Sequence, residues 1–252
     1  MINVSKLRKE FELSRQQKKE LNTTAKIAIA VDDLSFECQP GKVFSLLGPN
    51  GAGKTTTLRM LSTILTPTAG SIEIAGIDAI KYPQEARAKI GFLTGSTGLY
   101  ARLTPLEIID YFAALYQVPT KERDERKKYL FDLLNMNDFL QKRIGKLSTG
   151  MKQKVSICRT MIHDPEVVIF DEPTSGLDVI TAENIIKLIR DCKDQGKTVI
   201  FSSHIMSEVD LLCDDLAIVH KGKLKYSGQM SDFRQNMEAN NLTEEFIRIV
   251  QR

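Results

Sequence analysis

The sequence predicts an α/β fold built around a mostly parallel sheet. Short apolar runs alternate with longer helical patterns along most of the 252 residues, and this alternation is typical of strands that are joined by helices. One run passes through a glycine-rich turn directly into a helical pattern. Another, at residues 167–170, is wholly apolar and ends in two acids, which indicates a strand buried on both faces. Such a chain buries roughly 70–75% of its unfolded surface and suits one large domain or two small ones.

The expected strands and helices follow one another in a regular order. Residues 12–26 are polar and are expected to form a long loop or hairpin tip between two N-terminal strands. Further strands are expected at residues 42–47, 71–75, 89–94, 166–170, 198–202 and 216–220. Helices are expected at residues 54–65, 148–163 and 180–195, and Gly196 is a plausible stop for the last one.

Helical periodicity dominates residues 104–141, which we expect to be a helical insertion in the α/β core. Apolar residues recur there at helical spacing in two groups. They are Leu106, Ile109, Ala113 and Tyr116, then Tyr129, Leu130, Leu133 and Leu134. The helix at 180–195 places Ile185, Ile186, Leu188, Ile189 and Cys192 on its inner face. The tail at 237–252 carries only a short amphipathic pattern.

Composition excludes several classes of protein. The net charge of +3 gives no support for a general nucleic-acid binder, so no nucleic-acid partner is expected. The longest apolar run, residues 111–116, is far shorter than the roughly 20 residues that a membrane-spanning helix needs. The N-terminus lacks the apolar stretch of a secretory signal. The four cysteines are widely spaced and form no C-x-x-C pair, which argues against structural zinc and a disulfide framework and favours a reducing cytoplasm.

Residues 48–56 read GPNGAGKTT and match the pattern G-x-x-x-x-G-K-[ST] between a strand and a helix. The glycines let successive backbone N–H groups turn toward phosphate oxygens, and the helix start adds positive potential. Lys54 is expected to reach the β- and γ-phosphates of ATP, and the hydroxyl of Thr55 is expected to bind Mg²⁺. The predicted phosphate-binding residues are Asn50, Gly51, Ala52, Gly53, Lys54, Thr55 and Thr56.

Asp171 and Glu172 follow the wholly apolar strand. The carboxyl ends of parallel strands meet at one edge of a sheet, so these acids are expected beside the phosphate loop. Asp171 would then belong to the Mg²⁺ site, and Glu172 could accept a proton from the attacking water. Kinases, GTPases, helicases and transporter ATPases all fit these features, and a small-molecule kinase is one alternative.

Residues 147–154, LSTGMKQK, distinguish these classes. They open a helix ahead of Asp171 and resemble the LSGGQ signature of ATP-binding cassette (ABC) proteins. Thr149 and Met151 depart from that signature, whereas Ser148 and Gly150 match it. The resemblance implies that Ser148 and Gly150 contact the ATP held by an opposite subunit.

The other landmarks of the ABC family follow in order. Residues 173–178, PTSGLD, resemble the D-loop region, with Asp178 as its aspartate, and His204 resembles the switch histidine that contacts the γ-phosphate. An imidazole ring can donate a hydrogen bond to a phosphate oxygen. Phe11 stands where the family places an aromatic ring against adenine. The remaining histidines, His163 and His220, match no landmark and are expected to be structural.

One landmark is missing after the strand near residues 90–93. The family places there a glutamine that reaches Mg²⁺ and the attacking water, but Gly95 stands nearest this position and has no side chain to coordinate anything. Water could fill the role, catalysis could be reduced, or another residue could substitute.

The resemblance covers nearly the whole chain. It implies a P-loop NTPase core with an N-terminal antiparallel β-subdomain and an inserted α-helical subdomain at about 96–163, all within one nucleotide-binding domain at 1–252. It further implies Mg²⁺-dependent ATP hydrolysis by a homodimer around two ATP molecules. A separate transmembrane permease would hold this dimer at the cytoplasmic face of the cell membrane. The helical insertion and the loop at 94–103 are the expected docking surface for that permease.

A finer resemblance concerns residues 98–104 (GLYARLT), the signature segment and residues 202–209 (SSHIMSEV). Together they look like the ATP-binding subunit of bacterial sodium-extruding ABC exporters of the NatA type. Sodium export is therefore the expected function, and export of a drug, lipid or polysaccharide is the alternative. A soluble ABC ATPase of DNA repair or translation is a third hypothesis. A chain of 252 residues leaves little room for the long coiled coils or second cassette of those proteins.

Overall fold

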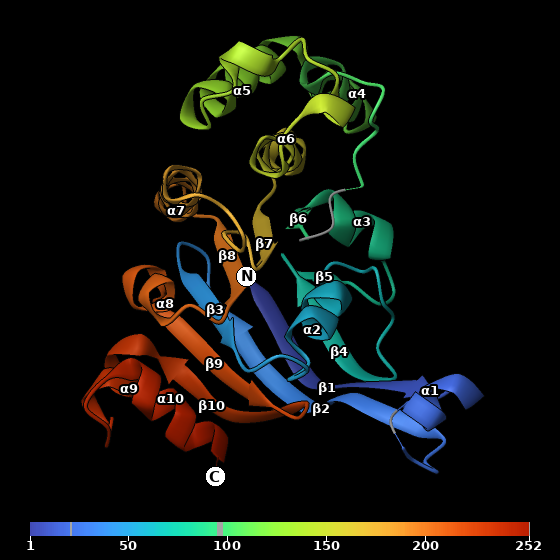
Figure 1. The fold of residues 1–252 in the computed structure, drawn as a ribbon, viewed down its shortest axis with the longest axis vertical. Helices are drawn as coiled ribbons and strands as arrows, with labels where there is room; N and C mark the ends of the chain where they lie inside the picture. Colours follow the sequence, from blue (N-terminus) through green and yellow to red (C-terminus); the bar gives the residue numbers. More distant parts are fainter. Residues whose placement is uncertain (21, 95–97, 252) are drawn as a thin grey trace.

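The computed structural model describes residues 1–20, 22–94 and 98–251, and these form two sheets with helices around them (Figure 1). The first sheet has four strands in the order β2-β1-β4-β5, and its pairings are antiparallel. Its strands are β1 (Ile2–Glu12), β2 (Ile27–Cys38), β4 (Ala69–Ile74) and β5 (Ile77–Asp78).

The second sheet has six strands in the order β10-β9-β3-β8-β7-β6. All its pairings are parallel except that of β9 with β10. Its strands are β3 (Val43–Leu47), β6 (Ile90–Leu93), β7 (Val167–Asp171), β8 (Thr198–Ser203), β9 (Asp215–His220) and β10 (Lys223–Gln229). The predicted α/β class with a mostly parallel sheet is therefore confirmed.

Apart from α1, which is described below, the helices divide into two groups in Figure 1. One group surrounds the sheets: α2 (Lys54–Leu61), α3 (Pro83–Ala88), α7 (Val179–Asp194), α8 (Met206–Leu212), α9 (Met230–Gln235) and α10 (Leu242–Gln251). The other gathers at the end away from the four-stranded sheet: α4 (Pro105–Leu115), α5 (Thr120–Leu133) and α6 (Thr149–Met161). Short 3-10 turns at Asn137–Phe139 and Ile144–Lys146 connect α5 to α6.

Two apolar cores hold these layers together, one on each face of the six-stranded sheet. Every residue of β3, β7 and β8 is buried, and alternate residues of β7 face different cores. Val168 and Phe170 pack into the core that α4–α8 share, whereas Val167 and Ile169 pack toward the four-stranded sheet. This two-sided burial explains why the sequence of β7 shows no polar alternation.

The connection between β1 and β2 contains a structured segment that the sequence analysis did not predict. The two strands pair as an antiparallel hairpin, as expected, but α1 (Arg15–Glu20) lies within the predicted loop. None of its residues is buried, so it has no apolar stripe that periodicity could have revealed.

One predicted helix is shorter than expected, and one strand was missed. The helix predicted at 54–65 ends at Leu61, because Ser62 caps it and Thr63 turns to a left-handed φ of 60°. Strand β10 was not predicted at all. Its residues alternate between exposed and half-buried positions at the edge of the sheet, so it lacks the apolar run by which the central strands were found.

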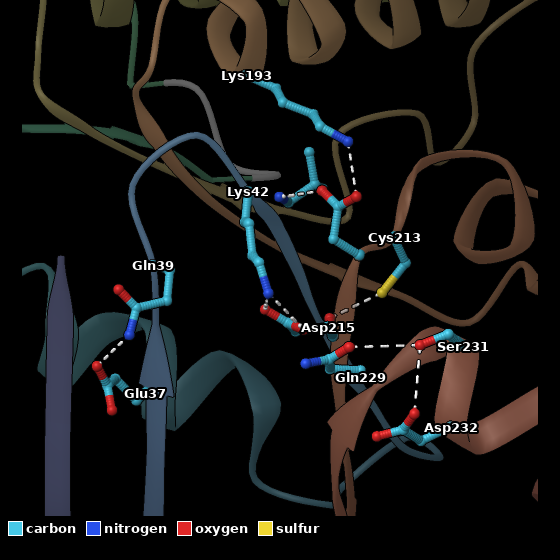
Figure 2. Close-up of polar contacts among 11 residues, drawn as sticks. Glu37, Gln39, Lys42, Lys193, Cys213, Asp215, Gln229, Ser231 and Asp232 are labelled. Atoms are coloured by element: carbon cyan, nitrogen blue, oxygen red, sulfur yellow. Dashed lines mark hydrogen bonds and ion pairs between the residues drawn. The ribbon is translucent and has the colours of Figure 1, made fainter.

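Polar contacts fasten the beginnings of β3 and β9 to each other and to the end of α7. Asp214 accepts hydrogen bonds from the backbone N–H of Val43 at 2.9 Å and from Lys193 Nζ at 2.6 Å. Lys42 forms an ion pair of 3.0 Å with Asp215, as Figure 2 shows. Because β3 and β9 are parallel, anchoring their first residues also sets where their last residues lie. The site described next begins at the turn that follows β3.

Candidate functional site

The glycine-rich turn connects β3 to α2 and wraps around the start of that helix. Gly51 and Gly53 have left-handed φ values of 77° and 106°. A Cβ atom on Gly53 would lie 2.5 Å from the carbonyl oxygen of Ala30, so no other residue fits there. The turn borders a pocket of about 180 Å³. Its lining consists of Ala30, Asn50, Gly51, Ala52, Gly53, Lys54, Thr55, Thr56 and Glu172.

Lys54, the first residue of α2, is held within this turn. Its side chain is only 5% exposed, and Nζ donates to the carbonyl oxygens of Gly48 at 2.7 Å and Pro49 at 3.3 Å. Burial lowers the pKa of Lys54, while the charges of Glu172 and Asp171 act in the opposite direction. A restrained ammonium group beside a helix start provides concentrated positive potential, which suits a phosphate group.

Asp171 ends β7 and lies beside Thr55. Its Oδ1 atom accepts hydrogen bonds from Thr55 Oγ1 at 3.1 Å and from Ser202 Oγ at 2.8 Å. A hydroxyl and a carboxylate are hard oxygen ligands of the kind Mg²⁺ prefers. Neighbouring ligands of an octahedral Mg²⁺ lie about 3 Å apart, given metal–oxygen distances of about 2.1 Å. The residues present therefore fit a magnesium ion.

Glu172 adopts a left-handed φ of 50°, which is uncommon for a residue with a side chain. Its backbone N–H donates to Ser202 Oγ at 3.0 Å and stabilises this turn. The side chain borders the pocket, and its Oε1 atom lies 3.3 Å from Nδ1 of His204 and 4.0 Å from Nζ of Lys54. A carboxylate in this position can accept a proton at the edge of this pocket, which we call the phosphate pocket.

Ser148, Gly150 and Asp178 lie together on a different surface. Ser148 caps α6 by accepting a hydrogen bond from the N–H of Met151 at 3.3 Å. Asp178 caps α7 through Thr181, whose backbone N–H lowers the pKa of the Asp178 carboxyl. A Cβ atom on Gly150 would lie 3.7 Å from Asp178 Oδ2. None of these three predicted residues lines the phosphate pocket.

Phe11 lies near the carboxyl end of β1. The pairing of β1 with β2 brings this end close to the phosphate pocket. It pairs with Ala28 of β2, and Ala30, two residues further along β2, lines the pocket. The ring is 38% exposed, and Lys9 Nζ lies 5.2 Å from its centroid. Phe11 itself does not line the pocket.

The position of the missing glutamine falls on Gly95, which lies outside the described residues, as does part of the expected docking loop at 94–103. Neither of the two histidines expected to be structural lines the pocket. His163 stacks on Tyr116 with ring centroids 3.8 Å apart, and its Nε2–H donates to the carbonyl oxygen of Ile90 at 3.1 Å.

Sequence reasoning missed the role of Ser202, which it quoted only as a neighbour of His204. Its hydroxyl donates to Asp171 and accepts from the N–H of Glu172, so one buried oxygen orients both acids. The signal was a hydroxyl residue at the carboxyl end of a buried strand. Recognising it would have required the pairing of Asp171 with Ser202 across parallel strands.

Comparison with known proteins agrees with this fold and site. A family model described as "ABC transporter" matches residues 31–175, and one described as "AAA domain, putative AbiEii toxin, Type IV TA system" matches residues 143–210. The ABC transporter ATP-binding protein NatA of Bacillus subtilis is 41% identical over 88% of this chain and 91% of that protein. The bacitracin transport ATP-binding protein BcrA of Bacillus licheniformis is 38% identical over 77% of this chain and 63% of that protein.

A solved structure of the ATP-binding subunit of an ABC transporter superposes with a TM-score of 0.87 and 26% identity, covering 99% of both chains. The chain therefore belongs to the ABC transporter family, and within that family it is an ATPase. Among the described residues, no helix is both long and apolar enough to cross a membrane.

Proposed function

We propose that this chain is the ATP-hydrolysing subunit of an ABC exporter, with residues 1–252 as one nucleotide-binding domain and a helical subdomain at about 96–163. The observation that carries the proposal is the convergence of five side chains at one edge of the parallel sheet. Asp171 ends β7, and the other four lie on the segments that follow β3, β7 and β8, which are neighbours in the sheet. The five are Lys54, Thr55, Asp171, Glu172 and His204.

Phosphate binding follows from the turn at residues 48–53 and from Lys54. The turn supplies backbone N–H groups, and the start of α2 supplies a positive helix end. Lys54 adds a full charge that exchanges its hydrogen bonds to the Gly48 and Pro49 carbonyls for phosphate oxygens. On this proposal Phe11 stacks on the adenine ring.

Thr55 and Asp171 would hold Mg²⁺, which when bound neutralises charge on the phosphate groups. Glu172 would accept a proton from the attacking water. His204 faces Glu172 with Nδ1, and its ring can donate a hydrogen bond to a phosphate oxygen. Glu172 and His204 would thus act as a pair at the γ-phosphate.

The surface formed by Ser148, Gly150 and Asp178 would complete the site of a second copy of the chain. Two exposed apolar residues directly follow Asp178, Val179 at 85% and Ile180 at 70% exposure. Apolar side chains exposed beside capped helix starts favour burial in an interface. We propose a homodimer that encloses two ATP molecules, each between the phosphate pocket of one chain and this surface of its partner.

A separate transmembrane permease would hold this dimer at the cytoplasmic face of the membrane. The expected docking region carries large exposed apolar residues in its described part, namely Tyr100, Tyr111 and Leu115. Tyr111 and Leu115 are four residues apart on α4 and therefore share one helix face, which supports a protein partner on the group formed by α4, α5 and α6.

Sodium is the cargo that we propose, on the subgroup resemblance and on the 41% identity to NatA. Drug export is the second candidate, because the bacitracin transport protein BcrA is also a relative. Deletion of the gene together with that of its permease separates the two. Growth that becomes sodium-sensitive supports sodium export, whereas sensitivity to an antibiotic at unchanged sodium tolerance contradicts it. A six-span permease in the adjacent reading frame is expected.

The substitution Glu172→Gln tests the catalytic assignment. It keeps the shape of the side chain but removes the proton acceptor, so we expect ATP binding to persist while turnover falls by roughly 10²- to 10⁴-fold. The variant should also accumulate as an ATP-bound dimer in size-exclusion chromatography. Wild-type turnover by this variant would rule out Glu172 as the base.

A further inference from the structure

Glu208, in the first turn of α8, joins two loops of the site through a single carboxylate. Its Oε1 atom accepts a hydrogen bond from Thr174 Oγ1 at 2.6 Å, and its Oε2 atom accepts one from Ser203 Oγ at 3.0 Å. Thr174 and Ser203 are both buried. Hydrogen bonds to a charged acceptor are among the stronger ones in proteins.

The two partners of Glu208 flank the two acid–base residues of the site. Thr174 lies two residues after Glu172, in a turn where the N–H of Ser175 donates to the carbonyl oxygen of Glu172 at 3.2 Å. Ser203 directly precedes His204, and its Oγ accepts a hydrogen bond from the N–H of Ile205 at 3.0 Å. One carboxylate therefore fixes the chain beyond Glu172 and on both sides of His204.

A hydrogen bond from α6 also holds the turn that contains Thr174. Gln153 of α6 donates from Nε2 to the carbonyl oxygen of Pro173 at 3.3 Å, and the Gln153 side chain is itself buried. The segment after Glu172 is thus clamped between the helix that Ser148 opens and the helix that carries Glu208. Motion of this turn would change the 3.3 Å contact between Glu172 and His204.

We propose that Glu208 is a positioning residue that holds His204 against Glu172. It touches neither ATP nor water in this role and acts through Thr174 and Ser203. The inference rests on the proposed function, because it takes Glu172 and His204 to be the acid–base pair. Loss of the brace lets two loops at the ends of β7 and β8 move independently. Misplacement of a catalytic group by about 1 Å can cost on the order of 100-fold in rate.

The substitution Thr174→Val tests the brace. Valine has the shape of threonine but cannot donate to Glu208, whereas Thr174→Ser keeps the hydroxyl. We expect T174V to lower kcat for ATP by roughly 10- to 100-fold, with KM unchanged within about twofold, and T174S to retain most of the activity. Ser207→Ala is the matched control, because Ser207 is exposed and lies in α8, the helix that carries Glu208. This variant should behave like wild type.

A second variant, Glu208→Gln, keeps one acceptor oxygen and loses the other. The double variant T174V/E208Q should be no slower than the slower single variant, because both remove the same connection. Thermal unfolding of every variant is measured in parallel. Equal losses of kcat in T174V, T174S and S207A, accompanied by lower Tm values, would show a packing effect and overturn the proposal.

Glu172→Gln is assayed beside these variants to separate two kinds of failure. Wild-type turnover by E172Q overturns the proposed role of Glu172 itself. Loss of turnover in E172Q together with wild-type kcat in T174V and E208Q overturns the brace alone.

Discussion

Glu172 shows how neighbouring groups fix the position of one residue. Its left-handed backbone costs on the order of 1–3 kcal/mol, and the hydrogen bond from its N–H to Ser202 Oγ offsets part of this. The same hydroxyl donates to Asp171. Because Ser202 is fully buried, its two hydrogen bonds are not replaced by water, and the two acids keep fixed positions relative to each other.

His163 gives a prediction for the pH dependence of stability. Burial lowers its pKa from the ordinary value of 6.5 to about 4. Between these values the unfolded chain binds a proton that the folded chain does not, so the free energy of unfolding should fall as the pH drops from 6.5 to 4. The loss is roughly 3 kcal/mol at most. His163→Phe keeps a ring against Tyr116 but cannot titrate, and it should flatten this dependence.

Urea unfolding of wild type and H163F at pH 7.5, 5.5 and 4.5 measures the effect. Identical slopes of stability against pH for the two proteins would contradict the assignment of this histidine as buried and neutral.

At the scale of elements, periodicity indicated which faces of α7 and α10 pack against the main core, but it did not indicate the surroundings of Tyr129 on α5. The five residues expected on the inner face of α7 are all buried. The four apolar residues of the tail, Leu242, Phe246, Ile249 and Val250, pack against the main core from α10. Tyr129 was grouped with three leucines of the same apolar pattern on α5, but it is 40% exposed and its hydroxyl donates to Asp191 of α7 at 2.6 Å. An amphipathic tyrosine can cover a helix edge while its polar tip finds a partner.

Helix α4 has the strongest start signal among the helices of the insertion. Thr104 Oγ1 accepts from the N–H of Glu107 at 3.2 Å, and Glu107 Oε2 accepts from the N–H of Thr104 at 2.8 Å, which completes a capping box. Those bonds to Thr104 lower the pKa of Glu107. The spacing of these residues is readable from sequence as T-x-x-E.

Thr104→Ala should therefore lower the free energy of unfolding by about 1 kcal/mol, since α4 loses its cap. ATP binding should be unchanged because α4 is far from the phosphate turn in the fold (Figure 1). Thr120→Ala is the control, at the exposed first residue of α5, which has no side-chain cap. Urea unfolding and nucleotide titration are the measurements, and equal destabilisation by both variants would argue against the cap.

At the scale of the whole molecule, the phosphate pocket and the surface formed by Ser148, Gly150 and Asp178 are separate. On the proposed function, one copy of the chain therefore cannot complete an ATP site by itself. The phosphate pocket is lined by the turn after β3, by Ala30 of β2 and by Glu172 after β7, whereas Ser148 and Asp178 cap helices outside that pocket. The contact between Gly150 and Asp178 groups the second surface into one patch beside Val179 and Ile180.

Ile180→Glu places a charge in this patch and should prevent the ATP-dependent dimer of the Glu172→Gln protein while leaving ATP binding by the monomer intact. Leu115→Glu is the matched control, because Leu115 is a similarly exposed apolar helix residue in the helical group. Size-exclusion chromatography with light scattering, in the presence of ATP, distinguishes them. A dimer that survives I180E but not L115E would place the interface elsewhere.

The sequence alone determined the class of fold, the phosphate turn, the acids after β7 and the family. Each of these features depends on residues that are close in the chain or on one wholly apolar strand, so the local sequence pattern is enough to predict it. Only the tertiary structure showed that Ser202 orients both acids and that Glu208 joins Thr174 to Ser203. It also showed that Gly150 adjoins Asp178 and that β10 extends the sheet. These contacts join segments that are distant in sequence and meet only when parallel strands align and helices pack on them. No local pattern encodes such meetings, because packing and loop closure across the folded chain decide them.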